Sequence, residues 1–225
     1  MLSDAIGELL PAAVAVALSP IPIVAIVLVL DGPRARGSGP AFALGWVVGL
    51  TTVSALVVFI ASAASDPGSD TATGINWFMA GIGLLFLVMA AQQWNKRPKR
   101  GETPEMPGWM ASINSVSPAK AVLLGMALSG ANPKNLALTF AASAAIANAE
   151  LDGADTAIAI TAFVAIGSIT VVGAVAFYLA TPARAARPLA TVKEFMANNS
   201  AVIMMVILLL LGVKILGDAI AGVWS

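Results

Sequence analysis

Hydrophobic residues form six long runs in this chain, and a polar or Pro/Gly-rich break separates each run from the next. An α-helix needs about 20 apolar residues to cross the hydrocarbon core of a bilayer, and each run reaches that length. The runs do not alternate apolar with polar residues, and they are too long for the strands of a membrane barrel. We therefore predict an all-α integral membrane protein with six transmembrane helices, at residues 9–30, 41–63, 75–94, 118–147, 156–180 and 200–222.

Charged residues in the breaks sort by sign along the chain. Of the 12 Lys and Arg, all but Lys134 and Lys214 lie in or directly beside the first, third and fifth breaks. The N-terminal segment and the second and fourth breaks carry Asp and Glu instead. Cytoplasmic loops of membrane proteins are the ones enriched in Lys and Arg. The odd-numbered breaks are therefore predicted to be cytoplasmic, and both termini outside.

The longest break, residues 95–116, is predicted to be a cytoplasmic linker between two three-helix halves, residues 1–94 and 117–225, of one membrane domain. It begins with a basic cluster that has two interpretations. The cluster can act as an orientation signal, or it can contact the headgroups of anionic lipids. Its members are Lys96, Arg97, Lys99 and Arg100.

Three spans in each half give the halves opposite orientations, which is the layout of an inverted-repeat transporter. Ala17-Leu18-Ser19 in the first half matches Ala127-Leu128-Ser129 in the second, and Pro follows each match within a few residues. Two independently kinked helices are the alternative interpretation. Matching the helix caps instead aligns Ser19 with Asn132, three residues away from the first register, and the sequence leaves both registers open.

The first and fourth runs are predicted to be broken helices, because each contains proline in its middle. A proline in a helix interior costs about 3 kcal/mol or more. At the first position of a helix its missing N–H is harmless, and Ser or Asn directly before it is a good cap. Ser19-Pro20 and Asn132-Pro133 both fit this pattern.

Lys134 directly follows Asn132-Pro133, the helix break in the fourth run, and lies near the middle of that run. A lysine at the bilayer centre costs on the order of 2.5–3.5 kcal/mol on insertion scales, so it is a candidate functional residue. A half-helix that begins inside the membrane presents unpaired N–H groups and a positive dipole end, which together with Lys134 suit a carboxylate, phosphate or sulfate. The alternative is a lysine that snorkels or is paired within the protein. The predicted substrate-binding residues are Ser19, Pro20, Pro22, Ser129, Asn132, Pro133, Lys134 and Asn135.

Two further pairs have helical spacing. Lys214 and Asp218 are four residues apart and share a helix face, so they form a local ion pair or take part in gating or proton coupling. Gly45 and Gly49 have the small-xxx-small spacing of close helix packing. That packing can lie within the chain or between the protomers of a homodimer.

Composition narrows the function classes. The chain of 225 residues is 59% hydrophobic and 11% charged, which is typical of a membrane protein and not of a soluble domain. It has no Cys and no His, and this excludes disulfides, thiol nucleophiles and His-ligated metals. No P-loop and no paired catalytic groups occur in the sequence, so we expect neither ATP use nor enzymatic activity. We also expect no cofactor, no metal site and no nucleic-acid partner, and the acidic start lacks the basic region of a signal peptide.

Several segments of the chain resemble the lysine-exporter (LysE) superfamily, and within it the Gap/Sap family of glycopeptidolipid- and sulfolipid-addressing proteins of actinobacteria. The segments are the Pro-broken first span, the turn at Arg34–Gly39 into a Gly-rich span, Asn132-Pro133-Lys134, and the Leu-rich ending from Ala201 to Gly222. The resemblance implies a six-span, multi-pass exporter in the bacterial plasma membrane. In the Gap/Sap branch the implied cargo is an envelope glycolipid or its precursor, and in other branches it is an amino acid or small solute.

Three functions are therefore compared. The first is a transporter that translocates an anionic envelope lipid or lipid-linked sugar and contacts membrane lipids. The second is a small-solute exporter, for an amino acid or a similar anionic metabolite, which uses the same site. The third is a scaffold without transport activity that assists envelope-lipid export.

Overall fold

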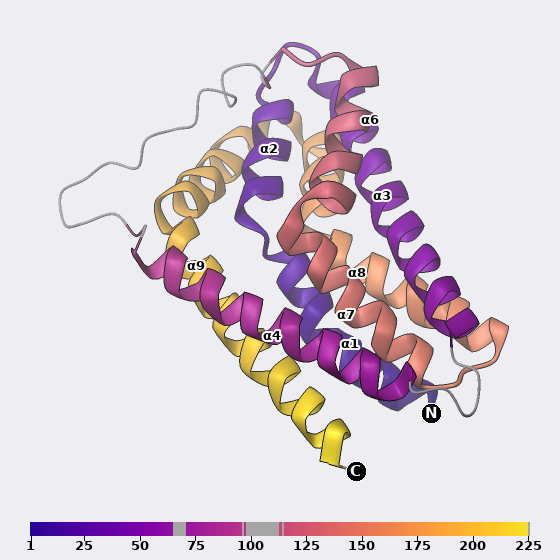
Figure 1. The fold of residues 1–225 in the computed structure, drawn as a ribbon. Coiled ribbons are helices and arrows are strands. Elements are labelled where there is room, and N and C mark those ends of the chain that lie inside the picture. Colours follow the sequence, from indigo (N-terminus) through magenta and orange to yellow (C-terminus); the bar gives the residue numbers. More distant parts are fainter. Residues whose placement is uncertain (65–70, 96, 98–112, 114, 225) are drawn as a thin grey trace.

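The computed structural model describes residues 1–64, 71–95, 97, 113 and 115–224 of the chain (Figure 1). All regular secondary structure in this part is helical, so the all-α prediction is confirmed for it. The elements are α1 (Leu2–Ala17), α2 (Pro20–Leu30), α3 (Ala35–Ala64), α4 (Thr71–Asn95), α6 (Pro118–Met126), the π-helical turn η1 (Ala127–Ala131), α7 (Pro133–Asn148), α8 (Gly153–Ala180) and α9 (Pro182–Trp224).

Three helical stretches in the described part are long and apolar enough to cross a membrane: Ala35–Ile60, Gly153–Ala180 and Arg184–Ile220. The pair α1 and α2 passes the same test as one broken span, with a bend of 48° between its halves. The structure thus supports up to four spans by length and composition. The six-span, 3+3 repeat topology stays a prediction, and so do the domain bounds and the outside location of both termini.

Two predicted breaks, residues 31–39 and 181–199, are largely helical. α3 begins at Ala35, and α9 continues for 43 residues from Pro182. The fifth break is rich in Ala, Arg, Lys, Glu, Leu and Met, which are strong helix formers, so its polarity does not end the helix. In this chain a polar stretch does not by itself end a helix, and Pro11, Pro40 and Pro188 also lie inside helices.

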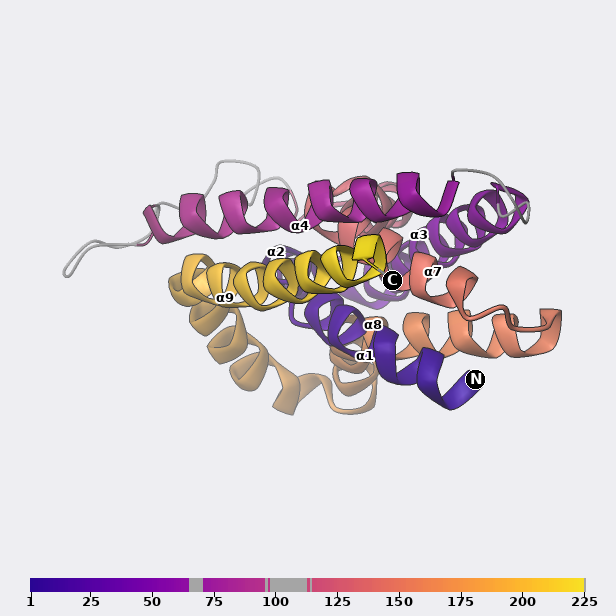
Figure 2. The same cartoon turned by 60° about the horizontal axis from the view of Figure 1, so that its bottom comes forward.

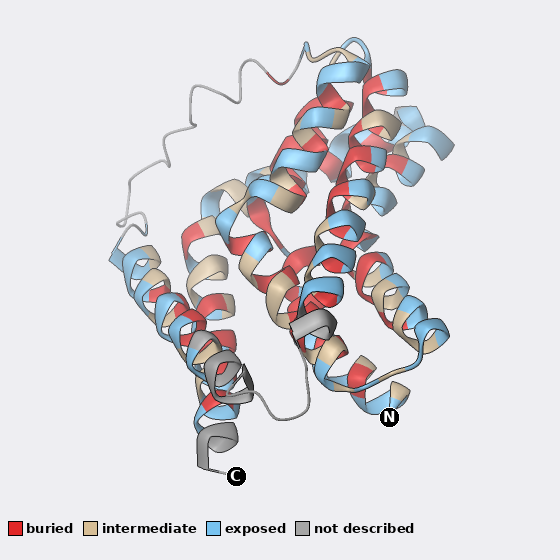
Figure 3. Ribbon diagram, turned by 45° about the vertical axis from the view of Figure 1, so that its right-hand side comes forward, coloured by how far each residue is buried: buried red, intermediate tan, exposed pale blue. Residues whose placement is uncertain are grey.

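α2 lies at the centre of the bundle. Ten of its eleven residues are buried, and Ile21 is the exception. A helix that is apolar all round is expected to be covered on every side. α3, α8 and α9 pack against α2, while α1 packs against α7 and α8. Figure 3 shows the buried residues concentrated where these helices face one another.

Two helix pairs pack closely against each other at glycine residues. A side chain at Gly45 or Gly49 of α3 would collide with Val122 of α6 or Ser129 of η1, and one at Gly125 of α6 would collide with α3. The close packing predicted for Gly45 and Gly49 is therefore found within the chain. α4 runs beside the C-terminal part of α9 in both views (Figures 1 and 2), and the contact includes Gly83 and Gly212.

The ends of the bundle differ in charge. Arg34, Arg36 and Tyr178 line one cavity, whereas Glu8 and Asp218 line another. In Figure 1 both chain termini lie at the end opposite to the turn between α2 and α3. Lys214 also lines the second cavity, where it is paired with Asp218, so the charge pattern along the bundle stays a prediction.

Candidate functional site

The first helix break lies between α1 and α2 and leaves two carbonyl groups of α1 to be satisfied from elsewhere. The N–H of Ser19 donates to the carbonyl of Val16 at 3.1 Å and not to that of Ala15, one residue earlier. Pro20 and Pro22 have no N–H, because the ring nitrogen of proline carries no hydrogen. Side chains of other helices supply the donors, and these contacts fix the position of the break.

The donors come from α7 and α8. Lys134 Nζ of α7 donates to the carbonyl oxygen of Ala15 at 3.1 Å. Thr170 Oγ1 of α8 donates to the carbonyl oxygen of Ala17 at 2.6 Å. The C-terminal end of α1 carries the negative end of its helix dipole, so an ammonium group is stabilised there.

The second helix break, between η1 and α7, has the same local geometry as the first helix break, between α1 and α2. Asn132 has φ −72° and ψ 119°, and Ser19 has φ −65° and ψ 114°; each precedes a proline at the first helical position. The Asn132 side chain accepts a hydrogen bond from the N–H of Lys134 at 3.1 Å. The breaks predicted in the first and fourth runs are therefore confirmed. The register that aligns Ser19 with Asn132 therefore aligns two residues with the same backbone conformation.

The two registers align Ser19 with Ser129 or with Asn132. Ser129 lies in η1, and Asn132 directly follows η1. A π turn contains more residues per turn than an α-helix, and such turns are frequent at functional sites. The sequence pattern did not predict this turn.

A chain of buried hydrogen bonds joins the two breaks. Lys134 Nζ donates to Ser19 Oγ at 2.9 Å, and Ser19 Oγ donates to Asn135 Oδ1 at 2.7 Å. Asn135 Nδ2 then donates to the carbonyl of Leu128 at 2.8 Å. Lys134 is 3% exposed, Ser19 2% and Asn135 0%. Residues 116 positions apart therefore form one polar cluster, which we call the break cluster: Ser19, Lys134 and Asn135 with the carbonyls of Ala15 and Leu128.

The positive charge of the break cluster has only neutral acceptors. Within the described residues Lys134 forms no ion pair, and its contacts are a carbonyl and a hydroxyl oxygen. A buried charge is costly unless it is paired and hydrogen-bonded, so a negatively charged group would find a favourable place here. The site is closed to solvent in this structure.

Other residues predicted for this site shape the breaks and lie outside the cluster of hydrogen bonds. Pro20 and Pro22 are buried in the first turn of α2, and Pro133 is exposed at the start of α7. Ser129 donates to the carbonyl of Met126 at 3.2 Å and lies against Gly49 of α3. Sequence reasoning missed the carbonyls of Ala15 and Ala17. A signal existed, since a broken helix leaves unpaired carbonyl groups as well as unpaired N–H groups.

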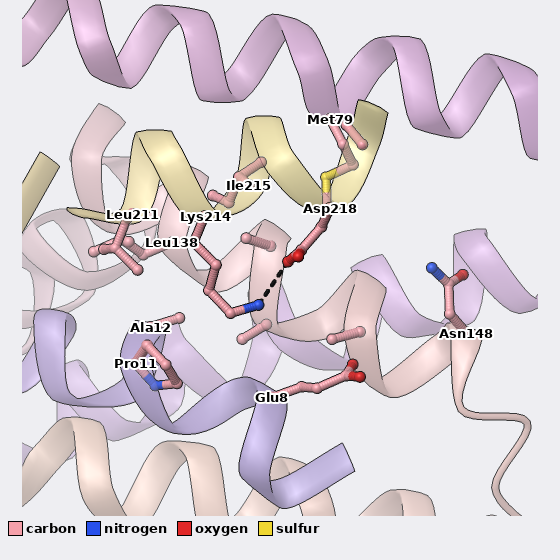
Figure 4. Close-up of a pocket in the computed structure, with 14 residues that line it drawn as sticks. Glu8, Pro11, Ala12, Met79, Leu138, Asn148, Leu211, Lys214, Ile215 and Asp218 are labelled. Atoms are coloured by element: carbon pink, nitrogen blue, oxygen red, sulfur yellow. Dashed lines mark hydrogen bonds and ion pairs between the residues drawn. The ribbon is translucent and has the colours of Figure 1, made fainter. Parts of the chain in front are cut away.

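Lys214 and Asp218 form an ion pair of 2.6 Å on α9, and both side chains are largely exposed. They line a cavity of about 170 Å³ together with Glu8, as Figure 4 shows. Leu138 also lines this cavity, one helical turn after Lys134 on the same face of α7. Leu138 is fully buried and lies between Lys134 and the end of α7 along the helix.

Of the basic cluster in the predicted linker, residues 95–116, only Arg97 belongs to the described part of the chain. Its guanidinium lies 3.6 Å from the ring centre of Trp94 and donates to the Trp94 carbonyl at 2.8 Å. Lys96, Lys99 and Arg100 lie outside the described residues.

Comparison with protein families gives one match that covers nearly the whole chain. The model of the family described as Sap, sulfolipid-1-addressing protein, matches residues 9–221. Comparisons with curated proteins and with solved structures give no match. The Sap part of the resemblance seen in the sequence is thereby confirmed.

Proposed function

The chain belongs to the sulfolipid-1-addressing protein family, and from this membership we propose that it is a bacterial plasma-membrane transporter for an anionic envelope lipid or glycolipid precursor. The observation that carries the proposal is the buried ammonium group of Lys134, which is held between two helix breaks by neutral acceptors. Broken helices near the middle of a membrane protein are where transporters bind their substrates.

An anionic headgroup would compete with the present acceptors of Lys134. The carbonyl of Ala15 and the hydroxyl of Ser19 each give a hydrogen bond without a formal charge, whereas a sulfate, phosphate or carboxylate adds a charge-assisted bond. Occupation by such a group would release Ser19 from Lys134. Ser19 directly precedes α2 and keeps its bond to Asn135, so that release would remove one of the two side-chain contacts that hold the first break.

The charge at the two ends of the bundle favours entry of an anion at one of them. Arg34 and Arg36 attract anions at one end, while the other end has Glu8 and the ion pair of Lys214 and Asp218. The cavity beside Lys214 and Asp218, which Leu138 lines one helical turn after Lys134, is a suitable release path. Movement from the basic to the acidic end would be export if the basic end is cytoplasmic, as the positive-inside pattern predicts.

The test is lipid movement in proteoliposomes that contain the full chain and a fluorescent anionic lipid. We expect Lys134→Met to slow the movement at least about tenfold, because a hydrogen bond to a charged group contributes about 1.5–3 kcal/mol and about 1.4 kcal/mol corresponds to a factor of ten. Lys120→Met changes an exposed lysine and serves as the control with unchanged movement. Equal rates for the two variants would remove Lys134 from the proposal.

The small-solute exporter and the scaffold are separate outcomes of the same preparation. An exporter of amino acids would release a radiolabelled amino acid from loaded vesicles in a Lys134-dependent manner while lipids stay in place. A scaffold would move neither cargo. Either result would replace the lipid transporter.

A further inference from the structure

An open apolar groove lies between α3 and α8, with a volume of about 580 Å³. The residues that line it include Val47 and Thr51 of α3 and Val164, Ser168, Ile169 and Val172 of α8. We propose that this groove binds the ester-linked acyl chain of a polar lipid. The identity of this occupant rests on the proposed lipid function.

The position of the groove along both helices places lipid against it. Its α3 residues lie near the middle of the candidate span Ala35–Ile60, and its α8 residues near the middle of Gly153–Ala180. The hydrocarbon core of a bilayer surrounds the middle of a span. Ile169 is 62% exposed and Val172 is exposed as well, so both present apolar surface to acyl chains.

Ser168 gives the groove a specific polar point. Its side chain is 3% exposed, and in the described part of the chain its hydroxyl has no hydrogen-bond partner. An unsatisfied hydroxyl in an apolar environment is unfavourable. The carbonyl oxygen of a fatty-acid ester would accept its hydrogen bond, whereas an ether-linked chain has no carbonyl to offer.

A thin wall separates the groove from the break cluster. Gly167, the neighbour of Ser168, lies against α1 and α3; a Cβ there would be 3.3 Å from Val16 Cγ1 and 3.5 Å from Leu50 Cδ1. Val16 directly follows Ala15, whose carbonyl accepts from Lys134. Gly167 thus places the helix that lines the groove against the segment of α1 that contacts Lys134.

Glycine supplies a way to block the groove without disturbing the fold. Gly173 lines the groove, and a Cβ added there meets no atom within 4 Å. Gly153, at the start of the same helix, is equally open and lies outside the groove. Gly173→Phe fills the groove, and Gly153→Phe is the matched control.

The experiment uses the purified full chain in nanodiscs that contain a phospholipid with a diazirine in its ester-linked chain. After irradiation, mass spectrometry maps the labelled residues. We expect labels to concentrate on the groove residues and Gly173→Phe to reduce them at least fivefold, while Gly153→Phe leaves them unchanged. Labels spread evenly over exposed apolar residues of α4 and α9, or labels insensitive to Gly173→Phe, would overturn the inference.

A second variant tests the role of Ser168. We expect the unmodified protein to label more strongly with the ester-linked probe than with its ether-linked analogue, and Ser168→Ala to abolish this difference. A loss of both labels in equal proportion would assign Ser168 to packing and overturn its proposed contact. Lys134-dependent lipid movement without groove labelling would refute this inference alone, and groove labelling without Lys134-dependent movement would refute the proposed function alone.

Discussion

Lys134 and Thr170 show how single side chains stabilise a broken helix. Each reaches from another helix to a carbonyl of α1 that lacks its usual backbone donor. A buried carbonyl without a donor costs about 1–3 kcal/mol. These two residues therefore have a structural role that does not depend on a substrate. Thr170 is outside the break cluster, so a substitution there tests the structural role alone.

Thr170→Val removes the donor to Ala17 but keeps the shape of the side chain. We expect the free energy of unfolding to fall by about 1–3 kcal/mol, measured by denaturant titration in detergent micelles. Thr161 is the control, because its hydroxyl donates to Ala157 of its own helix and is exposed. Thr161→Val is expected to stay within about 0.5 kcal/mol of the unmodified protein, and a similar loss in both variants would contradict our account of the break.

At the level of the elements, glycine sets the distance between α3 and α6. Their backbones approach so closely that Gly45 and Gly125 leave no room for a Cβ. Small residues of this kind let helices pack without a hydrophobic driving force in lipid. The α3–α6 contact holds η1 and the second break against α3, so its loss would also disturb Asn132.

Gly45→Ala should lower the stability of the protein although alanine is the better helix former. The added methyl group meets the Val122 carbonyl, and over-packing costs about 1–3 kcal/mol. Gly173→Ala meets open space and should be neutral or stabilising by up to about 1 kcal/mol. Thermal denaturation of the two variants in the same detergent checks this, and equal melting temperatures would show that the close contact is not maintained.

Local chemistry made some elements predictable and left others out of reach. The breaks at Ser19 and Asn132 follow from cap-then-proline patterns, which act within a few residues. The partners of Lys134 depend on how α1 and α7 approach each other, and no local pattern of the sequence records that approach. The groove at Ser168 was missed for the same reason, since two spans distant in sequence form it. The continuity of α9 was missed because polarity was taken as a sign of a loop.

At the scale of the whole molecule, a formal net charge of zero conceals two ends of opposite character. Arg34 and Arg36 lie at the basic end, and Glu8 lies at the other end with the ion pair of Lys214 and Asp218. Such a charge distribution orients a membrane protein during insertion. It also acts along the whole length of the bundle on any anion that crosses it.

Orientation can be measured with single cysteines, because the chain contains none of its own. Ser3 and Ser115 are both exposed, and the predicted topology places them on opposite sides of the membrane. A Ser→Cys substitution changes one atom at each position. We expect a membrane-impermeant maleimide to label Ser3→Cys in intact cells, and Ser115→Cys only after permeabilisation. The reverse pattern would place the basic end outside and would invert the predicted direction of transport.

The hydrogen bonds of the break cluster have a consequence for the kinetics of the molecule. Ser19 directly precedes α2 while its hydroxyl bonds Lys134 and Asn135 of α7, so neither break can reorient without disturbing both. For the proposed transporter, this coupling predicts one cooperative opening transition, without a state that is open to both sides at once.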